Sequence, residues 1–308
     1  MLWVVIPAWN EAENLVELIP RVVDAVTGAD AAGRVLVVDD GSTDDTRKVM
    51  ADLGATFPGV EAVHQNRNAG KAAALDVGFT HAVDGGATRI VMMDADGQDD
   101  PAELPRLLAG LDDGADLVTG ARNHGRNDRF VKRNTSKIYN RVTGMLSGTP
   151  GRDFNSGYKA MRAEVARDAA PMLYGELHRY LTVIAYWLGY KVAEVPVQHH
   201  ARMHGKSKYG LARFWRGFVD LVTVRFLMSY EHRPSHLFSG FGVSSFLLGS
   251  VGLAYLLVLK IAGETIGGRP LLIASVLHVV IGLQLVLFGL LAELLVYTRR
   301  NASNRGRA

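Results

Sequence analysis

Two carboxylates one residue apart, Asp94 and Asp96, follow the apolar run that extends from Arg89 to Met93. Alternate side chains of a strand point to the same side, so the two acids would share a face, with Gln98, if the strand geometry continues that far. Two crowded carboxylates stay ionised at low cost only when a cation lies between them. A hard divalent cation held by few carboxylates fills its remaining positions with substrate phosphates. The spacing therefore predicts a metal and phosphate site, and an acidic strand end on the surface is the alternative.

Polar residues also follow two other predicted strands. Asn10 and Glu11 come after the run at residues 2–6, and Asp39 and Asp40 follow the run at residues 34–38. Ligands of open α/β sheets bind beyond the carboxyl ends of the strands, so these polar ends predict one shared site. The alternative for residues 39–44 is a helix N-cap made by a serine or an aspartate.

The elements that would position these residues alternate along the first 120 residues or so, which is typical of an α/β sheet. We expect strands at residues 2–6, 34–38, 60–63, 89–93 and 116–119, and helices at 13–26, 43–53, 70–82 and 101–111. Parallel strands with intervening helices bring the polar strand ends to the same edge of the sheet.

The C-terminal part of the chain is much more apolar than an ordinary soluble protein. Hydrophobic residues make up 48% of the chain, and two long runs, 237–259 and 271–297, contain one charged residue, Glu293. About 20 apolar residues cross a bilayer, so we expect two membrane spans; a buried hairpin in a soluble core is the alternative. Basic residues are concentrated before the first run and after the second, which predicts that both termini are cytoplasmic. We expect no secretory signal, because Met1 leads directly into a strand.

Composition excludes several other classes of protein. The chain has no cysteine, which excludes disulfide and thiolate chemistry, and its net charge of +3 is too small to indicate nucleic acid binding. The basic bias suits anionic membrane lipids. We expect a catalytic domain at residues 1–210, an amphipathic juxtamembrane region at 211–235, the two spans within 236–300 and a basic tail at 301–308. The alternative for the helical pattern at residues 211–228 is a helix packed on the sheet.

Several of these motifs together resemble family 2 glycosyltransferases, which have the GT-A fold, a Rossmann-like α/β domain for nucleotide-diphosphate sugars. The resemblance rests on residues 7–11, 39–46, 68–71 and 94–98; residues 153–157 and 205–209 resemble its polyprenyl-phosphate branch, which includes dolichol-phosphate mannose synthases and bacterial polyprenyl-phosphate glucosyltransferases. It implies inverting transfer of mannose or glucose from GDP-mannose or UDP-glucose to dolichyl or undecaprenyl phosphate at the cytoplasmic membrane face.

The resemblance also implies roles for individual residues on the donor side. Mg²⁺ or Mn²⁺ would be bound by Asp94, Asp96 and Gln98, with Asp96 also counted as catalytic. The nucleotide sugar would be bound by Pro7, Asn10, Glu11, Asp39, Asp40, Lys71, Asp94 and Ala95, and by a closing loop that contains Arg202, Ser207, Lys208 and Tyr209. Closure of such a loop would exclude water from the reaction.

On the acceptor side, Asp153 stands where the family has a proposed catalytic base. A phosphomonoester has its second pKa near about 6, so its oxygen is largely anionic already and needs positioning more than deprotonation. Asp153 would then orient the acceptor or organise nearby cations. The candidate phosphate ligands are Arg122, Lys132, Arg133 and Ser136, and a solvated basic face is their alternative. Residues 175–179 are expected to have a structural or sugar-proximal role.

The sequence disfavours three alternatives to this function. His199, His200 and His204 suggest zinc, but no carboxylate or thiolate is spaced with them, so we expect no zinc site. A processive polysaccharide synthase would carry a Gln-x-x-Arg-Trp string, which this sequence lacks. A non-catalytic, membrane-anchored nucleotide-sugar-binding protein is disfavoured by the intact acidic motif. The sequence leaves open whether the chain forms a homo-oligomer.

Overall fold

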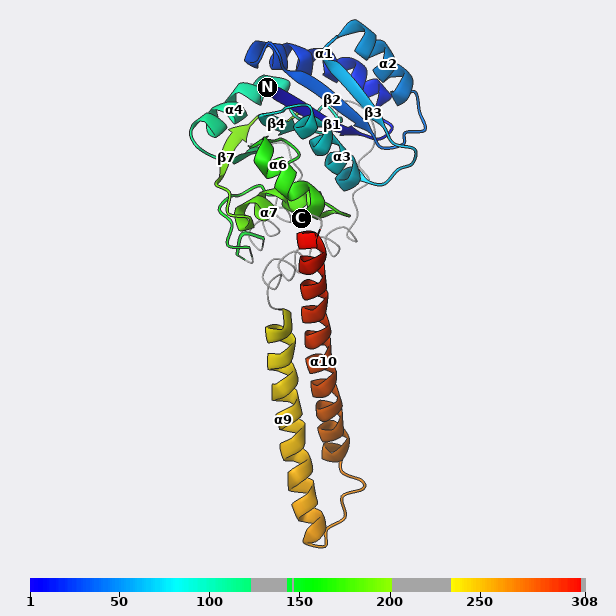
Figure 1. Ribbon diagram of the computed structural model, residues 1–308, viewed down its shortest axis with the longest axis vertical. Helices are drawn as coiled ribbons and strands as arrows, with labels where there is room; N and C mark the ends of the chain where they lie inside the picture. The colour runs from blue at the N-terminus through cyan, green and yellow to red at the C-terminus, as the bar shows by residue number, and fades with distance from the viewer. Residues whose placement is uncertain (123–142, 146, 201–233, 306–308) are drawn as a thin grey trace. The chain divides into compact units, whose positions relative to one another are not determined.

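The computed structural model describes residues 1–122, 143–145, 147–200 and 234–305 (Figure 1). The chain divides into two compact units, Met1–Val224 and Arg225–Ala308, which are taken separately below. The predicted juxtamembrane region at 211–235 lies almost wholly outside the described residues, so its amphipathic character stays a prediction.

The first unit is built on a seven-stranded mixed sheet with the order β3-β2-β1-β4-β6-β5-β7. Its strands are β1 (Leu2–Ala8), β2 (Arg34–Asp39), β3 (Val60–His64), β4 (Arg89–Met92), β5 (Leu117–Arg122), β6 (Lys159–Arg162) and β7 (Val192–Val197). Only β6 runs against its neighbours, since its pairs with β4 and β5 are antiparallel and all the others are parallel. The carboxyl ends of six strands therefore lie at one edge, where β6 begins.

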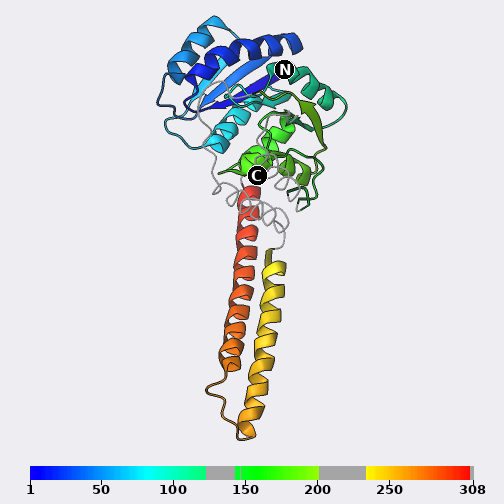
Figure 2. The ribbon, with the colours of Figure 1, turned by 180° about the vertical axis from the view of Figure 1, so that it is seen from behind.

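Helices cover both faces of this sheet (Figures 1 and 2). The helices are α1 (Ala12–Ala29), α2 (Thr46–Thr56), α3 (Lys71–Asp84), α4 (Leu104–Asp112), α6 (Ala163–Ala169) and α7 (Leu181–Trp187), with 3₁₀ turns η1 (Pro101–Glu103), η2 (Ala170–Met172) and η3 (Leu177–Tyr180). Contacts group α1, α2 and α4 against one face and α3, α6 and α7 against the other.

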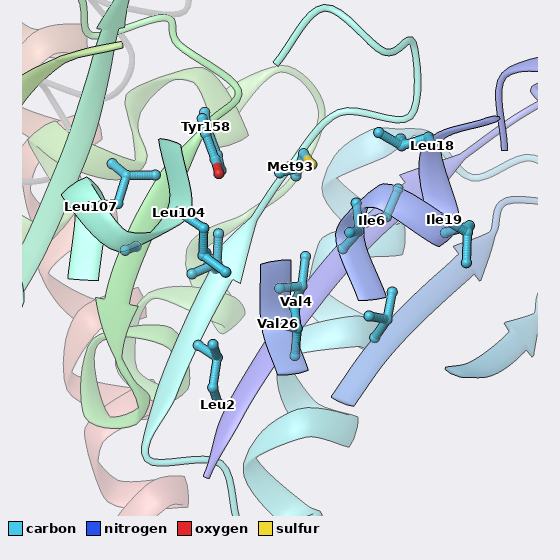
Figure 3. Close-up of a cluster of buried hydrophobic side chains, with 14 of the residues drawn as sticks. Leu2, Val4, Ile6, Leu18, Ile19, Val26, Met93, Leu104, Leu107 and Tyr158 are labelled. Atoms are coloured by element: carbon cyan, nitrogen blue, oxygen red, sulfur yellow. The ribbon is translucent and has the colours of Figure 1, made fainter. Parts of the chain in front are cut away.

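The core on the α1 side follows from strand alternation. Val4 and Ile6 of β1 point toward Leu18 and Ile19 of α1, and Leu104 of α4 closes the cluster (Figure 3). All five side chains are essentially inaccessible to water. Burial of this kind supplies the main stabilisation of the domain, at about 1.5–3 kcal/mol for each large apolar side chain.

On the other face, α3 approaches the sheet closely. A Cβ atom added at Gly78 would lie 2.4 Å from Cγ1 of Val5 and 3.0 Å from Cγ2 of Val38. Only glycine fits this contact, which lets the middle of α3 lie close to β1 and β2.

The predicted α/β architecture is confirmed, with the five predicted strands and four predicted helices in place. The second helix begins at Thr46 instead of residue 43, after Asp44 accepts a hydrogen bond from Thr46 N at 3.0 Å. The elements between residues 159 and 197 were not predicted. They are short, and β6 has a charged residue at each end, so no periodic pattern marks them.

The second unit consists of two long helices, α9 (Pro234–Ile261) and α10 (Pro270–Arg305), which lie side by side in both views (Figures 1 and 2). The stretches Phe238–Ile261 and Pro270–Leu295 are long and apolar enough to cross a membrane, with mean hydropathies of 2.0 and 2.5. In the most apolar 18-residue window of each stretch only 17% and 11% is buried, which disfavours the alternative of a hairpin inside a soluble core. The two predicted spans are therefore confirmed as a pair of exposed apolar helices.

Small residues let the two helices pack closely, as is common between helices in membranes. A Cβ atom added at Gly282 would lie 2.5 Å from the backbone N of Phe246 and 2.6 Å from the carbonyl oxygen of Gly242. The Ser245 hydroxyl donates to the His278 carbonyl oxygen at 2.9 Å across the pair.

We expect Gly282→Ala to destabilise the hairpin by about 1–3 kcal/mol, because the new methyl group meets backbone atoms that cannot move alone. The measurement is the melting temperature of the full chain in detergent. Gly240→Ala is the matched control, since nothing lies within 4 Å of its added Cβ. Equal melting temperatures for the two variants would contradict the close packing.

Candidate active site

Strand pairing brings the candidate catalytic residues to one edge of the sheet. Lys159, the first residue of β6, pairs with Met92 at the end of β4 and with Thr119 in the middle of β5. The loop before Lys159 therefore lies beside the residues that follow β4 and β5. This places Asp153 near Arg122 and Gly157 near Asp94, as the contacts below show.

The acidic motif after β4 is positioned by a turn and not by strand alternation. The strand ends at Met92, and Gly97 has a φ of 70°. The prediction that Asp94, Asp96 and Gln98 share a face because the strand continues is wrong in that premise. Asp94 instead pairs with the Lys71 ammonium through Oδ1 and packs over the backbone of Gly157.

The charge state of Asp94 follows from its neighbours. Burial works to raise its pKa, but the Lys71 ammonium outweighs this effect and holds the pKa of Asp94 below its usual range. Asp96 is 8% exposed, and its Oδ1 accepts a hydrogen bond from Gln98 N at 3.2 Å. Ala95 between them is buried.

The donor set at this edge fits a hard divalent cation. Asp94 and Asp96 offer carboxylate oxygens, and the Asp94 side chain is 34% exposed and therefore accessible. Among the residues that the structure describes, no group of three or more acidic, histidine or cysteine side chains is placed to hold a metal. Mg²⁺ is commonly bound by one or two carboxylates and completed by water and substrate phosphates. Asp94 and Asp96 thus fit such an ion better than they fit a closed protein cage.

Gln98 takes part in a connection between the acidic turn and the end of β7. The side-chain Nε2 of Gln98 donates to the His200 carbonyl oxygen at 3.3 Å, and the backbone carbonyl oxygen of Gln98 accepts from His200 N at 2.8 Å. His199 Nδ1 lies 3.3 Å from Asp99, and His200 Nε2 lies 2.9 Å from Asp100. Two of the three histidines considered for zinc are thus paired with carboxylates, and His204 lies outside the described residues.

Asn10 and Asp39, two of the residues predicted to bind the nucleotide sugar, take part in hydrogen bonds that connect the ends of β1 and β2. Asn10 has a φ of 55°, its backbone N donates to Ser42 Oγ at 2.9 Å, and its Oδ1 accepts from Thr43 N at 2.8 Å. Asp39 accepts from Ser42 N at 2.8 Å and contacts His64 Nδ1 at 2.9 Å. Burial works to raise the pKa of Asp39, but hydrogen bonds from Ser42 and His64 lower it overall. Asp39 is therefore ionised, and with Asn10, Ser42 and His64 it forms a hydrogen-bonded floor at the ends of β1, β2 and β3.

Pro7 and Glu11 flank this floor. Pro7 is a partly exposed residue of β1, and Glu11 is the N-cap position of α1, where its backbone N donates to Thr46 Oγ1 at 3.1 Å. Both lie at the carboxyl edge of the sheet, as predicted.

Asp40 fixes the beginning of α3 through its side chain, and its contact with the nucleotide sugar stays a prediction. Its two carboxylate oxygens accept hydrogen bonds from Ala69 N and Gly70 N, each at 2.8 Å. Gly70, with a φ of 93°, is the N-cap of α3, which begins at Lys71. Asp40 therefore fixes the backbone that carries Lys71, and the structure supports a positioning role for it.

Asp153 and Arg122 form a bidentate ion pair on the acceptor side. Arg122 Nε lies 2.7 Å from Asp153 Oδ2, the terminal nitrogen lies 2.8 Å from Oδ1, and Arg122 N also donates to Oδ2 at 3.2 Å. Burial works to raise the pKa of Asp153, but Arg122 outweighs it and lowers the pKa. Asp153 is thus an ionised partner of the Arg122 guanidinium, and its role toward the acceptor stays a prediction.

Sequence reasoning missed Lys159, which is completely buried. Its Nζ donates to the carbonyl oxygens of Phe154 and Ser156, so it holds the loop that carries Asp153. Burial lowers the pKa of Lys159 to about 8, with Asp153 opposing the shift. A lysine that follows the aromatic residue of the Asn-Ser-Gly-Tyr stretch was the only available signal.

Glu194 of β7 was missed as well, because a single acid in an apolar strand gives no signal. Its carboxylate accepts hydrogen bonds from Arg152 N and from Asp153 N, the latter at 3.4 Å. The loop before β6 is therefore fixed at both its ends.

His178, in the segment expected to be structural or sugar-proximal, is kept neutral. Burial and the nearby charges of Lys71 and Arg179 lower the pKa of His178 to about 3. Its Nδ1 is buried and has no partner among the residues that the structure describes.

Seven predicted site residues lie outside the described residues. They are Lys132, Arg133 and Ser136 of the acceptor group, and Arg202, Ser207, Lys208 and Tyr209 of the closing loop. Their roles stay predictions.

We expect Gly157→Ala to lower sugar transfer about 10- to 100-fold by displacing Asp94, since the added Cβ would lie 2.5–2.6 Å from its carboxylate atoms. Gly144→Ala is the control, because its added Cβ meets Phe154 at an ordinary 3.6 Å. Transfer rates and melting temperatures of both variants check this. Full activity of Gly157→Ala would contradict the prediction that transfer requires Asp94 to keep its position against the backbone of Gly157.

Solved structures resemble the first unit in fold. The mannosyltransferase PcManGT from Pyrobaculum calidifontis, in complex with GDP-Man and Mn²⁺, is 20% identical with a TM-score of 0.54, covering 74% of this chain and 63% of that one. Staphylococcus aureus TarS residues 1–349 are 15% identical with a TM-score of 0.51, covering 74% and 65%. The sheet with its acidic turn at the carboxyl edge therefore has the GT-A fold of nucleotide-sugar glycosyltransferases.

The family model of Glycosyl transferase family 2 matches residues 3–169, and the chain belongs to this family. A dodecaprenyl-phosphate galacturonate synthase of Rhizobium johnstonii is 33% identical, covering 98% of this chain and 90% of the relative. An undecaprenyl-phosphate 4-deoxy-4-formamido-L-arabinose transferase of Enterobacter sp. is 34% identical with the same coverages. The chain is thus a glycosyltransferase whose full-length relatives are polyprenyl-phosphate sugar transferases.

Proposed function

We propose that this protein transfers one sugar from a nucleotide-diphosphate sugar to a polyprenyl phosphate at the membrane surface. The observation that carries the proposal is the juxtaposition made by β6. It brings an acidic turn suited to a cation, Asp94 to Asp96, beside a partly buried Arg122–Asp153 pair suited to a phosphate. The full-length likeness to polyprenyl-phosphate sugar transferases supports the same acceptor class.

On the donor side, Asp94 and Asp96 would hold Mg²⁺ or Mn²⁺, with Gln98 as a further oxygen ligand. The bound ion would supply Lewis acidity toward the leaving diphosphate. The residues of the chain position this group. Asp39 and Asn10 fix the floor beneath the nucleoside, Asp40 fixes the start of α3, and neutral His178 can share a hydrogen bond with a sugar hydroxyl.

On the acceptor side, the lipid phosphate oxygen attacks the anomeric carbon, and the bond from that carbon to the nucleotide phosphate breaks, with inversion. The attacking oxygen is already anionic near neutral pH, so Arg122 would neutralise and orient it while Asp153 holds Arg122 in place. Lys132, Arg133 and Ser136 would complete this group.

A panel of nucleotide-sugar donors identifies the sugar that the protein transfers. Mannose and glucose stay our predictions, and the relatives named for galacturonate and 4-deoxy-4-formamido-L-arabinose define the other classes to include. Purified full chain is incubated with undecaprenyl or dolichyl phosphate and each labelled donor, with Mg²⁺, with Mn²⁺ and with EDTA. We expect metal-dependent label in the lipid fraction from one donor. Label in the lipid with EDTA would contradict metal dependence, and no label from any donor would contradict lipid phosphate as acceptor.

We further propose that both termini are cytoplasmic, on the basis of the basic residues that flank the two spans. The chain has no cysteine, so a single introduced cysteine reports its own position. In intact cells a membrane-impermeant maleimide should label Gly267→Cys, in the exposed turn between α9 and α10, and should not label Ala31→Cys in the first unit. The reverse pattern would overturn this orientation.

A further inference from the structure

The backbone of Lys71 is held in place by hydrogen bonds, while its side chain is long enough to change its partner. Asp40 accepts from Ala69 N and Gly70 N at 2.8 Å each, so the start of α3 cannot move independently of β2. The Lys71 side chain is 29% exposed, and its ammonium pairs with Oδ1 of Asp94. A long flexible stem on a fixed backbone lets the charged end change partners without moving the fold.

Asp94 is also the carboxylate best placed to bind a cation. Its side chain is 34% exposed, whereas Asp96 is 8% exposed and already accepts from Gln98 N. On its other side Asp94 is confined by Gly157, where an added Cβ would lie 2.5 Å from Oδ2. If a divalent cation and the Lys71 ammonium were both bound to the Asp94 carboxylate, the two positive charges would lie close together and repel each other. One of the two has to leave.

We propose that Lys71 and the divalent cation compete for Asp94, and that the ammonium transfers to the diphosphate of the donor when metal and nucleotide bind. This inference rests on the proposed function. The nucleoside diphosphate brings negative charge that replaces Asp94 as the partner of Lys71. The first turn of α3 favours an anion at the same place, because the helix dipole is positive there. Lys71 thereby occupies Asp94 while the donor is absent and binds the donor once it arrives.

A permanent structural ion pair makes a different prediction. If Lys71 only neutralised Asp94, its removal would let the metal bind more tightly and would leave nucleotide binding unchanged or improved. If Lys71 transfers to the diphosphate, its removal tightens the metal and weakens the nucleotide. The two opposite signs in one variant distinguish the exchange from the static pair.

The test uses purified full chain, Lys71→Met, Lys71→Arg and the control Lys48→Met, which changes an exposed lysine of α2. Mn²⁺ binding without nucleotide is measured by electron paramagnetic resonance, and UDP and GDP binding at saturating Mn²⁺ by calorimetry. For Lys71→Met we expect about 10-fold tighter Mn²⁺ and about 10-fold weaker nucleotide binding, each equivalent to about 1.4 kcal/mol. Lys71→Arg, which keeps the charge, and Lys48→Met should show neither change.

Each other result has a distinct meaning. Unchanged or weaker Mn²⁺ binding by Lys71→Met would overturn the competition. Tighter Mn²⁺ with unchanged nucleotide binding would overturn the transfer to the diphosphate. If the wild-type protein bound neither UDP nor GDP, the proposed function itself would fail, and that result is separate because it needs no variant.

Discussion

Replacing Asp96 by Asn should reduce sugar transfer about 100-fold or more and leave the protein folded. The amide keeps an oxygen that can accept from Gln98 N, now at 3.2 Å, so the turn is retained. The charge that would bind the metal is lost, and a metal that stabilises the leaving diphosphate contributes several kcal/mol to the transition state. Transfer from the active donor to polyprenyl phosphate, together with the melting temperature, measures both expectations.

The matched control is Asp52→Asn, which changes an exposed acid of α2 by the same chemistry. It should retain full activity. Transfer by Asp96→Asn within about threefold of wild type would contradict the metal role of this carboxylate. If the wild type transfers sugar, the protein is not a non-catalytic nucleotide-sugar-binding protein. This conclusion holds even if Asp96→Asn still binds UDP after losing its activity.

Asp153→Asn and Arg122→Gln should each lower kcat/KM for the lipid phosphate by about 100-fold, and the double variant should be little worse than either. Breaking one partner of a buried bidentate pair typically costs about 2–5 kcal/mol, and residues that act as one unit do not add. The double variant also removes the unpaired buried charge that each single change leaves behind. Kinetics of the three variants against lipid phosphate give the coupling.

The pH profile separates positioning by Asp153 from general base catalysis. Arg122 lowers the pKa of Asp153, so its carboxylate is ionised over the whole working range, and protonation that breaks the pair requires a pH below the usual aspartate value of about 3.9. The acid limb of the rate should then follow the acceptor phosphate near about pH 6 and should persist in Asp153→Asn. A rate that loses this limb in Asp153→Asn would show that Asp153 is the base.

A surface pair provides the control for this series. Arg162 lies 3.4 Å from Asp116 at the opposite end of β6 from Lys159, and both side chains are partly exposed. Arg162→Gln should leave transfer unchanged, because exposed ion pairs contribute little and this one is far from the site along the strand.

Much of the fold could be predicted because β1, β2 and β4 are buried almost throughout and read as apolar runs. The polar residues that end these runs also predicted the correct edge of the sheet. The arrangement of Asp94 and Asp96 could not be derived in the same way, because β4 stops at Met92 and a glycine turn then sets their directions.

The acceptor side was harder to predict because it depends on pairing between distant segments. Arg122 and Asp153 are separated by a long stretch of chain, and nothing in either local sequence indicates that they meet. Lys159 is a charged residue in a fully buried position, which sequence patterns disfavour, and only the loop carbonyls of Phe154 and Ser156 make that burial tolerable. The positions of these two carbonyl groups depend on how the loop folds and cannot be derived from the sequence pattern.

The antiparallel strand β6 has a consequence for the order in which the site matures. The parallel strands β3, β2, β1 and β4 can pair as soon as residue 92 is available, so the floor around Asp39 belongs to the early part of the chain. The acceptor side waits for β6 to insert between β4 and β5. Both steps are nonlocal, because Leu2 of β1 pairs with Arg89 of β4, and Ile90 of β4 pairs with Met161 of β6. A growing chain that ends before residue 162 therefore lacks the complete strand that brings Asp153 to Arg122, and under the proposed function it could not yet bind the lipid phosphate.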